Sequence, residues 1–484
     1  MSNSTTQYSR LVCLTLFFGL MCGQIEAQHY PVSNEKLLFI GQDLNSVADY
    51  RNDCVGCHPG HGETSYLFFY GLEESYIYID ASREIHFGAL DMDNSGVENT
   101  NMTNWGAGDL NLWAAAERSP LINIGLSIVE DQFFGQDGLQ KIINGDHDSK
   151  IAKLTSFFNQ FPNNIFYLRI GYEFDGSWNG YNAAKYKGAF QRIVEQMRPA
   201  LNRDNVEFVW QSCTSPIDDI IDGGQENLAN YYPGDQYVDW MGLSWFLKPN
   251  ENPTLGSITP ATQLILVNEL LSFAQSKNKP IMIAEAAPQG YDLSAGTNCN
   301  ISSIYDGNAA TGCVAKTAIE IYQEWFEPIL NFMATNDEVR AISYINANWD
   351  SQFTWGPASN YGSGYWGDTR VEADTAIMGR WINAIANPSN QFLQTENPME
   401  ILNAVSTVSI EKGFESPLEI KIFPNPSQQL LHLEGSESSY QYTLLNLEGD
   451  TLLIGKGAEI DIAAFPAGVY LLKIDGSTAK IIKQ

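Results

Sequence analysis

Apolar residues along the chain gather in short runs separated by longer segments of mixed polarity. Eight runs of strand length lie between residues 37 and 349 and are close to continuous rather than alternating. A continuous apolar run predicts a strand with both faces buried, as in a parallel sheet. The predicted strands are 37–43 (LLFIGQD), 84–92 (EIHFGALDM), 121–129, 165–174, 206–212, 238–246, 281–288 and 339–349.

Segments of helical periodicity lie between several of these runs. Residues 181–201, 261–279 and 318–335 carry apolar positions three or four apart. Eight strands with intervening helices predict an α/β fold, a (β/α)8 TIM barrel that we assign to residues 28–387. In that fold the chemistry takes place at the carboxyl ends of the strands, so a polar residue that ends a strand is a candidate for function.

The pattern changes after the predicted barrel. Residues 388–416 show little periodicity and are predicted to be a linker. Residues 417–484 contain short alternating runs separated by Gly, Pro and Asn, which predicts a small C-terminal β-sandwich.

The N-terminal residues have the pattern of an export signal. Arg10 precedes the apolar run LVCLTLFFGLMCG, and the segment resembles a secretory signal peptide, residues 1–27, that ends near Ala27. The run is too short for a transmembrane helix, and no later stretch is long and apolar enough. We therefore expect an exported protein without membrane insertion.

The charge of the chain limits the partners that it can bind. The formal net charge is −30, from 57 acidic and 27 basic residues. Nucleic acids, anionic membranes and anionic polysaccharides would be repelled, whereas a neutral ligand would not. Aromatic residues make up 12% of the chain, which suits stacking on sugar rings and equally suits an ordinary core.

Two glutamates end predicted strands. Glu173 closes the fourth strand and Glu285 the seventh, where a core position would hold Val or Ile. A buried, unpaired carboxylate is costly, so the pair suggests divided functions at one end of the barrel. Retaining glycoside hydrolysis needs such a pair, with one group protonated and the other ionised. The alternative is structural ion pairing, for which Arg169 has the right strand parity relative to Glu173.

Several segments around these glutamates resemble glycoside hydrolase family 26. Trp178 follows Glu173 by five residues, as a sugar-binding tryptophan does in that family. The other matching segments are YYPGDQYVDWMGLSWF (231–246), IAEAAP (283–288), YINANWD (344–350) and WGDTRVE (366–372). The resemblance covers about residues 36–385.

This resemblance implies a secreted, endo-acting, retaining glycosidase that hydrolyses O-glycosyl bonds of a neutral β-linked hemicellulose, β-mannan or β-1,3-xylan. It implies that Glu173 is the general acid/base and Glu285 the nucleophile, with Trp178 and Trp349 stacking on sugars. We expect no cofactor and no metal.

The chain departs from the family at two positions. Tyr172 replaces a histidine before the acid/base, and Phe246 stands where a tyrosine often bonds the nucleophile. Tyr172 and Trp245, next to Phe246, are further candidates for substrate binding. The two departures also motivate an alternative function, a non-catalytic carbohydrate-binding barrel.

The C-terminal segments FPNP, GVYLLKID and KIIKQ resemble the C-terminal sorting domain of the type IX secretion system. This implies that the secretion machinery is a partner and that the protein is secreted or held at the cell surface. A binding or spacer sandwich is the alternative interpretation.

The motif CVGCH at residues 54–58 has the C-x-x-C-H spacing of a c-type haem site, which is a third and less favoured interpretation. In an exported protein, Cys54–Cys57 and Cys299–Cys313 are candidate disulfides. Because the motif follows the first predicted strand, we expect its loop at the same end of the barrel as the glutamates. His58 and His61 are then candidate substrate contacts.

Overall fold

A computed structural model describes residues 29–31, 33–42, 44–68, 77–80, 83–87, 112–128, 137–218, 227–250, 261–299, 313–351, 366–402, 421–424, 427–434, 439–446, 451–474 and 477–483. The chain forms two compact units, Met1–Ser409 and Ile410–Gln484. The predicted signal segment, residues 1–27, lies outside the described residues.

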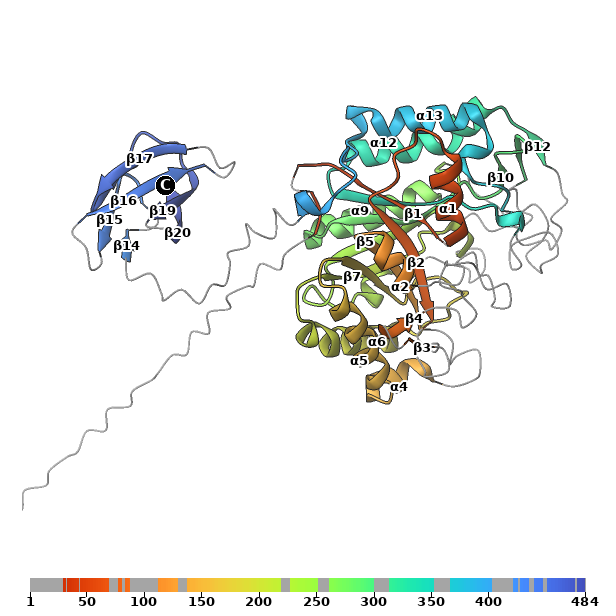
Figure 1. The fold of residues 1–484 in the computed structure, drawn as a ribbon, viewed down its shortest axis with the longest axis horizontal. Coiled ribbons are helices and arrows are strands. Elements are labelled where there is room, and N and C mark those ends of the chain that lie inside the picture. Colours follow the sequence, from red (N-terminus) through yellow and green to blue (C-terminus); the bar gives the residue numbers. More distant parts are fainter. Residues whose placement is uncertain are drawn as a thin grey trace, which may run out of the picture. The chain divides into compact units, whose positions relative to one another are not determined.

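The first unit contains a closed barrel of eight parallel strands, with helices around its outside (Figure 1). The barrel confirms the predicted fold class, and the apolar runs become strands buried on both faces. In spatial order the strands are β1 (Leu37–Gly41), β13 (Val339–Ile345), β9 (Ile281–Ala286), β8 (Trp240–Trp245), β7 (Val206–Ser212), β6 (Ile165–Ile170), β5 (Leu121–Ser127) and β2 (Gly62–Phe68).

The segments with helical periodicity are helices, and several carry their own caps. The side chain of Asn182 caps α6, and Thr317 and Glu320 form a capping box at α11. The helices are α1 (Leu44–Asp53), α2 (Leu112–Arg118), α4 (Gly138–Asn144), α5 (Asp148–Gln160), α6 (Ala183–Met197), α8 (Leu228–Tyr231), α9 (Gln263–Lys277), α11 (Ala318–Ile321), the π-helical turn η4 (Tyr322–Phe326), α12 (Glu327–Thr335) and α13 (Thr375–Ala386). Short 3₁₀ turns are η3 (Arg198–Ala200), η5 (Trp349–Ser351), η6 (Val371–Ala373) and η7 (Pro388–Asn390).

One predicted barrel strand is wrong. Residues 84–87 belong to β4 (Arg83–Phe87), which pairs among the described residues with β3 (Ile77–Asp80) in an antiparallel hairpin outside the barrel, and residues 88–92 lie outside the described residues. The second barrel strand is β2, with the sequence GETSYLF. Its inward Thr64 bonds Ser343, while its outward Glu63 bonds Arg118, so β2 is not a continuous apolar run.

The interior of the barrel is divided into two layers along the strands. Near the amino ends the inward side chains are apolar and include Phe39, Leu121, Ile165, Val209 and Trp240. Further along the same strands the inward side chains become polar. These polar residues are Thr64, Asn123, Arg169, Gln211, Ser244, Glu285 and Ser343. A larger apolar core lies between the strands and the surrounding helices.

The segment after α13 packs against the amino end of the barrel. Lys36, which precedes β1, bridges to Phe392, and Leu393 and Leu402 join the inner apolar layer. The predicted linker is therefore wrong for residues 388–402. Its remainder, 403–416, lies outside the described residues.

The second unit confirms the predicted β-sandwich. One sheet contains β14 (Lys421–Phe423), β15 (Leu430–Glu434) and β18 (Glu459–Asp461), and the other contains β17 (Thr451–Gly457), β16 (Tyr440–Leu445), β19 (Gly468–Ile474) and β20 (Ser477–Lys483). Alternating side chains such as Leu431, Leu433, Leu444 and Leu472 form its core.

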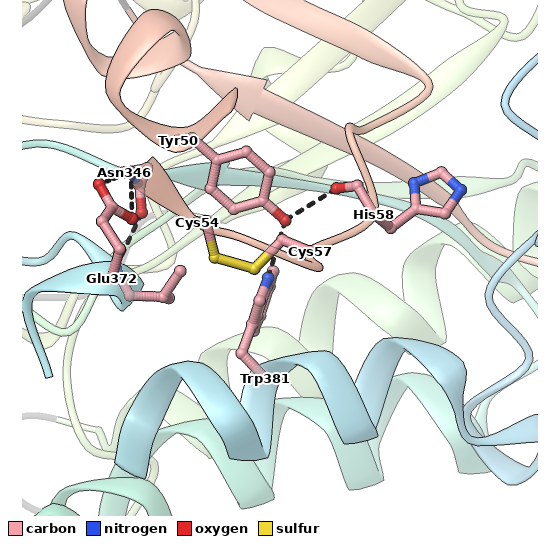
Figure 2. The surroundings of a disulfide bond; sticks show 8 residues. Tyr50, Cys54, Cys57, His58, Asn346, Glu372 and Trp381 are labelled. Carbon is pink, nitrogen blue, oxygen red and sulfur yellow. Dashed lines mark hydrogen bonds between the residues drawn. A yellow bond between two sulfur atoms is a disulfide. The ribbon is translucent and has the colours of Figure 1, made fainter. Parts of the chain in front are cut away.

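Both candidate disulfides form in the structure, and Cys213 is a buried free thiol. Cys299–Cys313 ties the small sheet formed by β10 (Tyr291–Asp292), β11 (Thr297–Asn298) and β12 (Val314–Ala315), which follows β9. Cys54–Cys57 lies between α1 and β2 (Figure 2).

Candidate active site

The polar layer inside the barrel places Glu285 next to a positive charge. Glu285 lies near the end of β9 and is only 6% exposed. Arg169 of β6 donates from Nη1 to Glu285 Oε1, and Gln211 of β7 donates from Nε2 to the same oxygen at 3.2 Å. Because the ion pair is buried, the guanidinium compensates the carboxylate that β9 brings out of water.

Space for the Arg169 side chain comes from a glycine on the neighbouring strand. A Cβ at Gly125 of β5 would lie 2.6 Å from Tyr66 Cδ1 and 2.9 Å from Arg169 Nη2. Arg169 Cζ lies 4.8 Å from the centre of the Tyr66 ring and 5.4 Å from that of Tyr172. These two rings hold the guanidinium against Glu285 by cation–π contact.

Glu173 lies just beyond the end of β6. The strand stops at Ile170, and both Gly171 and Glu173 have positive φ, +55° and +52°. Such a backbone is unfavourable for glutamate and turns its side chain toward the barrel axis. Ser244 Oγ of β8 donates to Glu173 Oε1 at 2.7 Å, and Trp178 Nε1 donates to Oε2 at 2.9 Å.

The loop that carries Glu173 is fixed to the next strand. Asp175 accepts hydrogen bonds from Ser212 Oγ at 2.5 Å and from the Cys213 backbone N–H at 2.7 Å. The Phe174 N–H also donates to the Gln211 carbonyl oxygen at 3.1 Å. The strained backbone at Glu173 is therefore held by contacts with the end of β7.

The surroundings of Glu173 favour its protonated form. Burial, and then the nearby charge of Glu285, raise the pKa of Glu173 to about 8, although hydrogen bonds from Ser244 and Trp178 oppose the shift. Glu285, in contrast, is ion-paired with Arg169. One carboxyl group thus holds a proton near neutral pH while a neighbouring one is paired as an anion.

The structure places three predicted binding residues at this end of the barrel. Trp178 is 41% exposed and contacts Glu173 directly. Tyr172 packs edge-on against Tyr66, with ring centres 5.3 Å apart. Trp349 is almost fully covered, because Thr369 accepts its indole N–H and Trp366 packs at 4.6 Å.

Trp245, a predicted binding residue, faces away from the site. Side chains alternate along a strand, and the inward position on β8 belongs to Ser244. Trp245 therefore points outward and packs against Phe332 of α12, fully buried in the outer core. The prediction that Trp245 binds substrate is wrong.

His61 is also misplaced in the prediction. Its ring accepts the Leu38 backbone N–H at 2.8 Å and lies 3.0 Å from the Leu393 carbonyl oxygen, both at the amino end of the barrel. Helix α1 carries the chain from the carboxyl end of β1 back to the start of β2, so the whole 54–61 loop lies opposite the glutamates. The predictions of His58 and His61 as substrate contacts are wrong for this reason.

Sequence reasoning missed two residues of the site, Ser244 and Tyr66. Ser244 stands in the apolar run WMGLSW, where a single polar residue near a strand end was the available signal. Tyr66 belongs to the strand that the apolar pattern did not reveal.

The described residues offer no cluster of three or more His, Cys, Asp or Glu that could hold a metal ion. The two sulfurs of the CVGCH motif are bonded to each other, which leaves no thiols to attach a haem. Within the part of the chain that the structure describes, no helix has the length and apolarity needed to cross a membrane.

Comparisons with known proteins agree with this geometry. Residues 132–286 match the family model "Glycosyl hydrolase family 26", and residues 421–484 match "Secretion system C-terminal sorting domain". The chain is 32% identical over 359 residues to the Beta-1,3-xylanase TXYA of a Vibrio species, and 32% identical over 363 residues to a Beta-1,3-xylanase of an Alcaligenes species. These alignments cover 73% and 74% of this chain, which spans 65% of the length of each relative.

Among solved structures, the catalytic domain of a Bacillus GH26 endo-beta-1,4-mannanase matches with a TM-score of 0.44 and 13% identity, over 76% of this chain and 90% of that one. The two sequence models fall on the two units described above. The family 26 model covers part of the barrel unit, and the sorting-domain model covers most of the C-terminal unit.

Proposed function

We propose that the protein is an endo-acting, retaining glycosidase that hydrolyses O-glycosyl bonds of a neutral β-linked hemicellulose. The observation that carries this proposal is the pair of buried glutamates at the carboxyl end of the barrel. Glu173 has its pKa raised to about 8, and Glu285 is ion-paired with Arg169. A protonated acid beside a paired carboxylate is what the two steps of retaining hydrolysis require.

In the first step Glu173 donates its proton to the glycosidic oxygen while Glu285 attacks the anomeric carbon. The C–O bond breaks, the leaving sugar departs as an alcohol, and a glycosyl ester forms on Glu285. Both hydrogen bonds described for Glu285 fall on Oε1, which leaves Oε2 for the attack. In the second step ionised Glu173 takes a proton from water, the water oxygen attacks the anomeric carbon, and Glu285 is released.

The relatives favour β-1,3-xylan over β-mannan as the substrate, because two of them are named as beta-1,3-xylanases at 32% identity. The net charge of −30 fits a neutral polysaccharide better than an anionic one. Trp178, exposed and adjacent to Glu173, offers an aromatic surface to a sugar at the cleavage point. Tyr172 and Trp349 are further candidates for contact with the sugar at this end of the barrel.

The sorting domain supports export through the type IX secretion machinery, with the protein released or held at the cell surface. Together with a leader at residues 1–27, it would place the barrel where polysaccharide chains are encountered.

The test is a substrate panel with product analysis. The full chain should release oligosaccharides of several lengths from β-1,3-xylan, more slowly or not at all from β-mannan and mixed-linkage glucan, and NMR should detect the β-anomer first. Glu285→Ala should lower the rate on the order of 10⁴-fold or more, since the nucleophile is lost. First appearance of the α-anomer, or undiminished activity of Glu285→Ala, would contradict the mechanism.

The second candidate function is a non-catalytic carbohydrate-binding barrel. It is motivated by Phe246, whose ring packs against Trp366 at 5.5 Å and offers no hydroxyl to the site. Binding of the same polysaccharides without release of reducing sugar would favour it over the hydrolase.

A further inference from the structure

A continuous chain of hydrogen bonds joins the two glutamates inside the barrel. Gln211 Nε2 donates to Glu285 Oε1 at 3.2 Å and to Ser244 Oγ at 3.0 Å, and Ser244 Oγ donates to Glu173 Oε1 at 2.7 Å. We propose that Ser244 and Gln211 are positioning residues, a bridge that holds Glu173 and Glu285 in register through both steps of the reaction. This inference rests on the hydrolase proposed above.

The orientation of the Gln211 amide is fixed by its other neighbour. Arg169 Nη1 donates to Gln211 Oε1 at 2.8 Å, and a guanidinium can only donate. The amide nitrogen must therefore face the carboxylates, where its two hydrogens serve Ser244 and Glu285. A flipped amide would set N–H against N–H at Arg169 and an oxygen against the carboxylate of Glu285.

Ser244 suits a partner whose proton comes and goes. A hydroxyl donates to an ionised carboxylate and, after rotation, accepts from a protonated one. The indole N–H of Trp178 on the other oxygen of Glu173 can only donate. Ser244 is therefore the described contact of Glu173 that can change from donor to acceptor when Oε1 carries the proton.

The backbone is built around this bridge. A Cβ at Gly242 would lie 2.8 Å from Gln211 Cβ, so the glycine on β8 gives the Gln211 side chain its room. The pairing of β8 with β9 shifts register between Leu243 and Ser244, which sets Ser244 opposite Glu285. The bridging side chains are fully buried, and their positions follow from strand geometry rather than from loop placement.

Several ionisable groups surround Glu173, so a bridge variant must be judged against them. Glu285 faces Glu173 from β9. Arg169 of β6 and Tyr66 of β2 lie next to Glu285. Asp175 lies on its own loop and Cys213 follows β7. Unlike these groups, the Ser244 hydroxyl stabilises the ionised form of Glu173 without carrying a charge, so its removal should raise the pKa of Glu173.

The experiment compares Ser244→Ala, Gln211→Leu and the double variant with Ser343→Ala as the matched control. Ser343 lies in the same polar layer and bonds Thr64 rather than either glutamate. Ser244→Ala should lower kcat roughly 10- to 100-fold, the effect of losing a hydrogen bond to a charged group. KM should change little, and the alkaline limb of kcat/KM should move to higher pH. Ser343→Ala should keep the wild-type profile, and Ser244→Thr should restore it.

If the two residues act as one bridge, the double variant should lose less than the product of the two single losses. Fully multiplicative losses, or a wild-type pH profile in Ser244→Ala, would overturn the proposal. Should Ser244→Ala not fold, Ser244→Gly, which also lacks the hydroxyl, gives the same readout.

A titration without turnover separates this proposal from the proposed function. In protein labelled with ¹³C at the glutamate carboxyls, the midpoint of Glu173 should rise in Ser244→Ala and stay unchanged in Ser343→Ala. If the wild-type protein hydrolyses no polysaccharide, the proposed hydrolase function is refuted. The bridge is judged separately: a raised Glu173 midpoint in Ser244→Ala would support it, and an unchanged midpoint would refute it.

Discussion

The barrel buries glutamates at both ends, and Glu173 at the carboxyl end differs from the ion-paired Glu285 beside it and from the glutamates at the amino end. At the carboxyl end Glu173 sits on a strained backbone, and the two hydrogen bonds described for it come from uncharged groups. At the amino end the carboxylates of Glu63 and Glu207 are matched by basic side chains. The difference indicates that one end of the barrel is arranged for chemistry and the other for stability.

The contacts at the amino end satisfy each carboxylate in turn. Glu63 accepts from Arg51 Nη1 at 2.6 Å and from Arg118 Nε at 3.0 Å. Glu207 accepts both the backbone N–H of His29 at 2.9 Å and its ring Nδ1 at 2.6 Å. Glu63 is therefore paired with arginines, and Glu207 is paired with a histidine that becomes positively charged when protonated. The two hydrogen bonds described for Glu173 come from uncharged groups, and its pKa is raised to about 8.

The largest expected effect tests the carboxyl end. Glu173→Gln should lower kcat on polysaccharide by about 1000-fold, because the general acid and base are lost together. Its melting temperature should not fall, since an amide keeps the contacts with Ser244 and Trp178 and carries no buried charge. Steady-state kinetics and calorimetry on the same preparation measure both quantities.

The matched variant at the amino end is Glu63→Gln. It leaves Arg51 and Arg118 without their counter-charge and should reduce the free energy of unfolding by roughly 3 kcal/mol. The kcat of the folded fraction should be unchanged. A loss of kcat in Glu63→Gln comparable to that in Glu173→Gln would remove the distinction between the two ends.

Most of the fold could be predicted from the sequence, since seven barrel strands are apolar runs. The exception is β2, whose inward Thr64 belongs to the polar layer and whose outward Glu63 is ion-paired. A strand whose polar residues are satisfied only by distant partners gives no local hydrophobic signal. The residues after α13 likewise have the pattern of a linker, because Leu393 and Leu402 join an apolar core only in the closed barrel.

The glutamate pair could be predicted because a charged residue that ends an apolar run is conspicuous. The errors at Trp245 and His61 have geometric causes. Strand parity turns Ser244 inward and so Trp245 outward. Helix α1, with the sequence LNSVADYRND, is too polar to give a helical pattern. The sequence therefore predicts the loop after it at the carboxyl end of the barrel, whereas the helix returns the chain to the amino end.

The next effect in size concerns the disulfide in that loop. Cys54–Cys57 follows α1, and Tyr50 of the same helix donates to the His58 carbonyl oxygen at 3.0 Å and accepts from Trp381 of α13 at 2.9 Å (Figure 2). Replacing both cysteines by serine should cost about 2 kcal/mol of unfolding free energy, the loop-closure value for so short a ring.

Because this loop lies opposite the glutamates, the kcat of the cysteine variant should equal that of the wild type. Chemical denaturation and initial rates measure the two quantities. A Soret band in the wild-type protein, or a large loss of kcat in the variant, would show that the motif has a function other than bracing the loop.

The smallest effect separates the two ends by pH. Activity should fall as pH rises past about 8, because Glu173 then loses the proton that it must donate.

At the amino end, burial alone would lower the pKa of His29, but the hydrogen bond and charge of Glu207 outweigh it and raise the pKa. A raised pKa means that the His29–Glu207 pair stabilises the fold fully below the unfolded value of 6.5, and that this contribution is lost as pH rises through the folded value. His29→Gln should therefore lower the melting temperature most at pH 5.5 and least at pH 9, while the alkaline limb of kcat/KM stays where Glu173 sets it. A deficit in melting temperature that is independent of pH would refute the protonated pair, and a displaced alkaline limb would mean that the two ends are coupled.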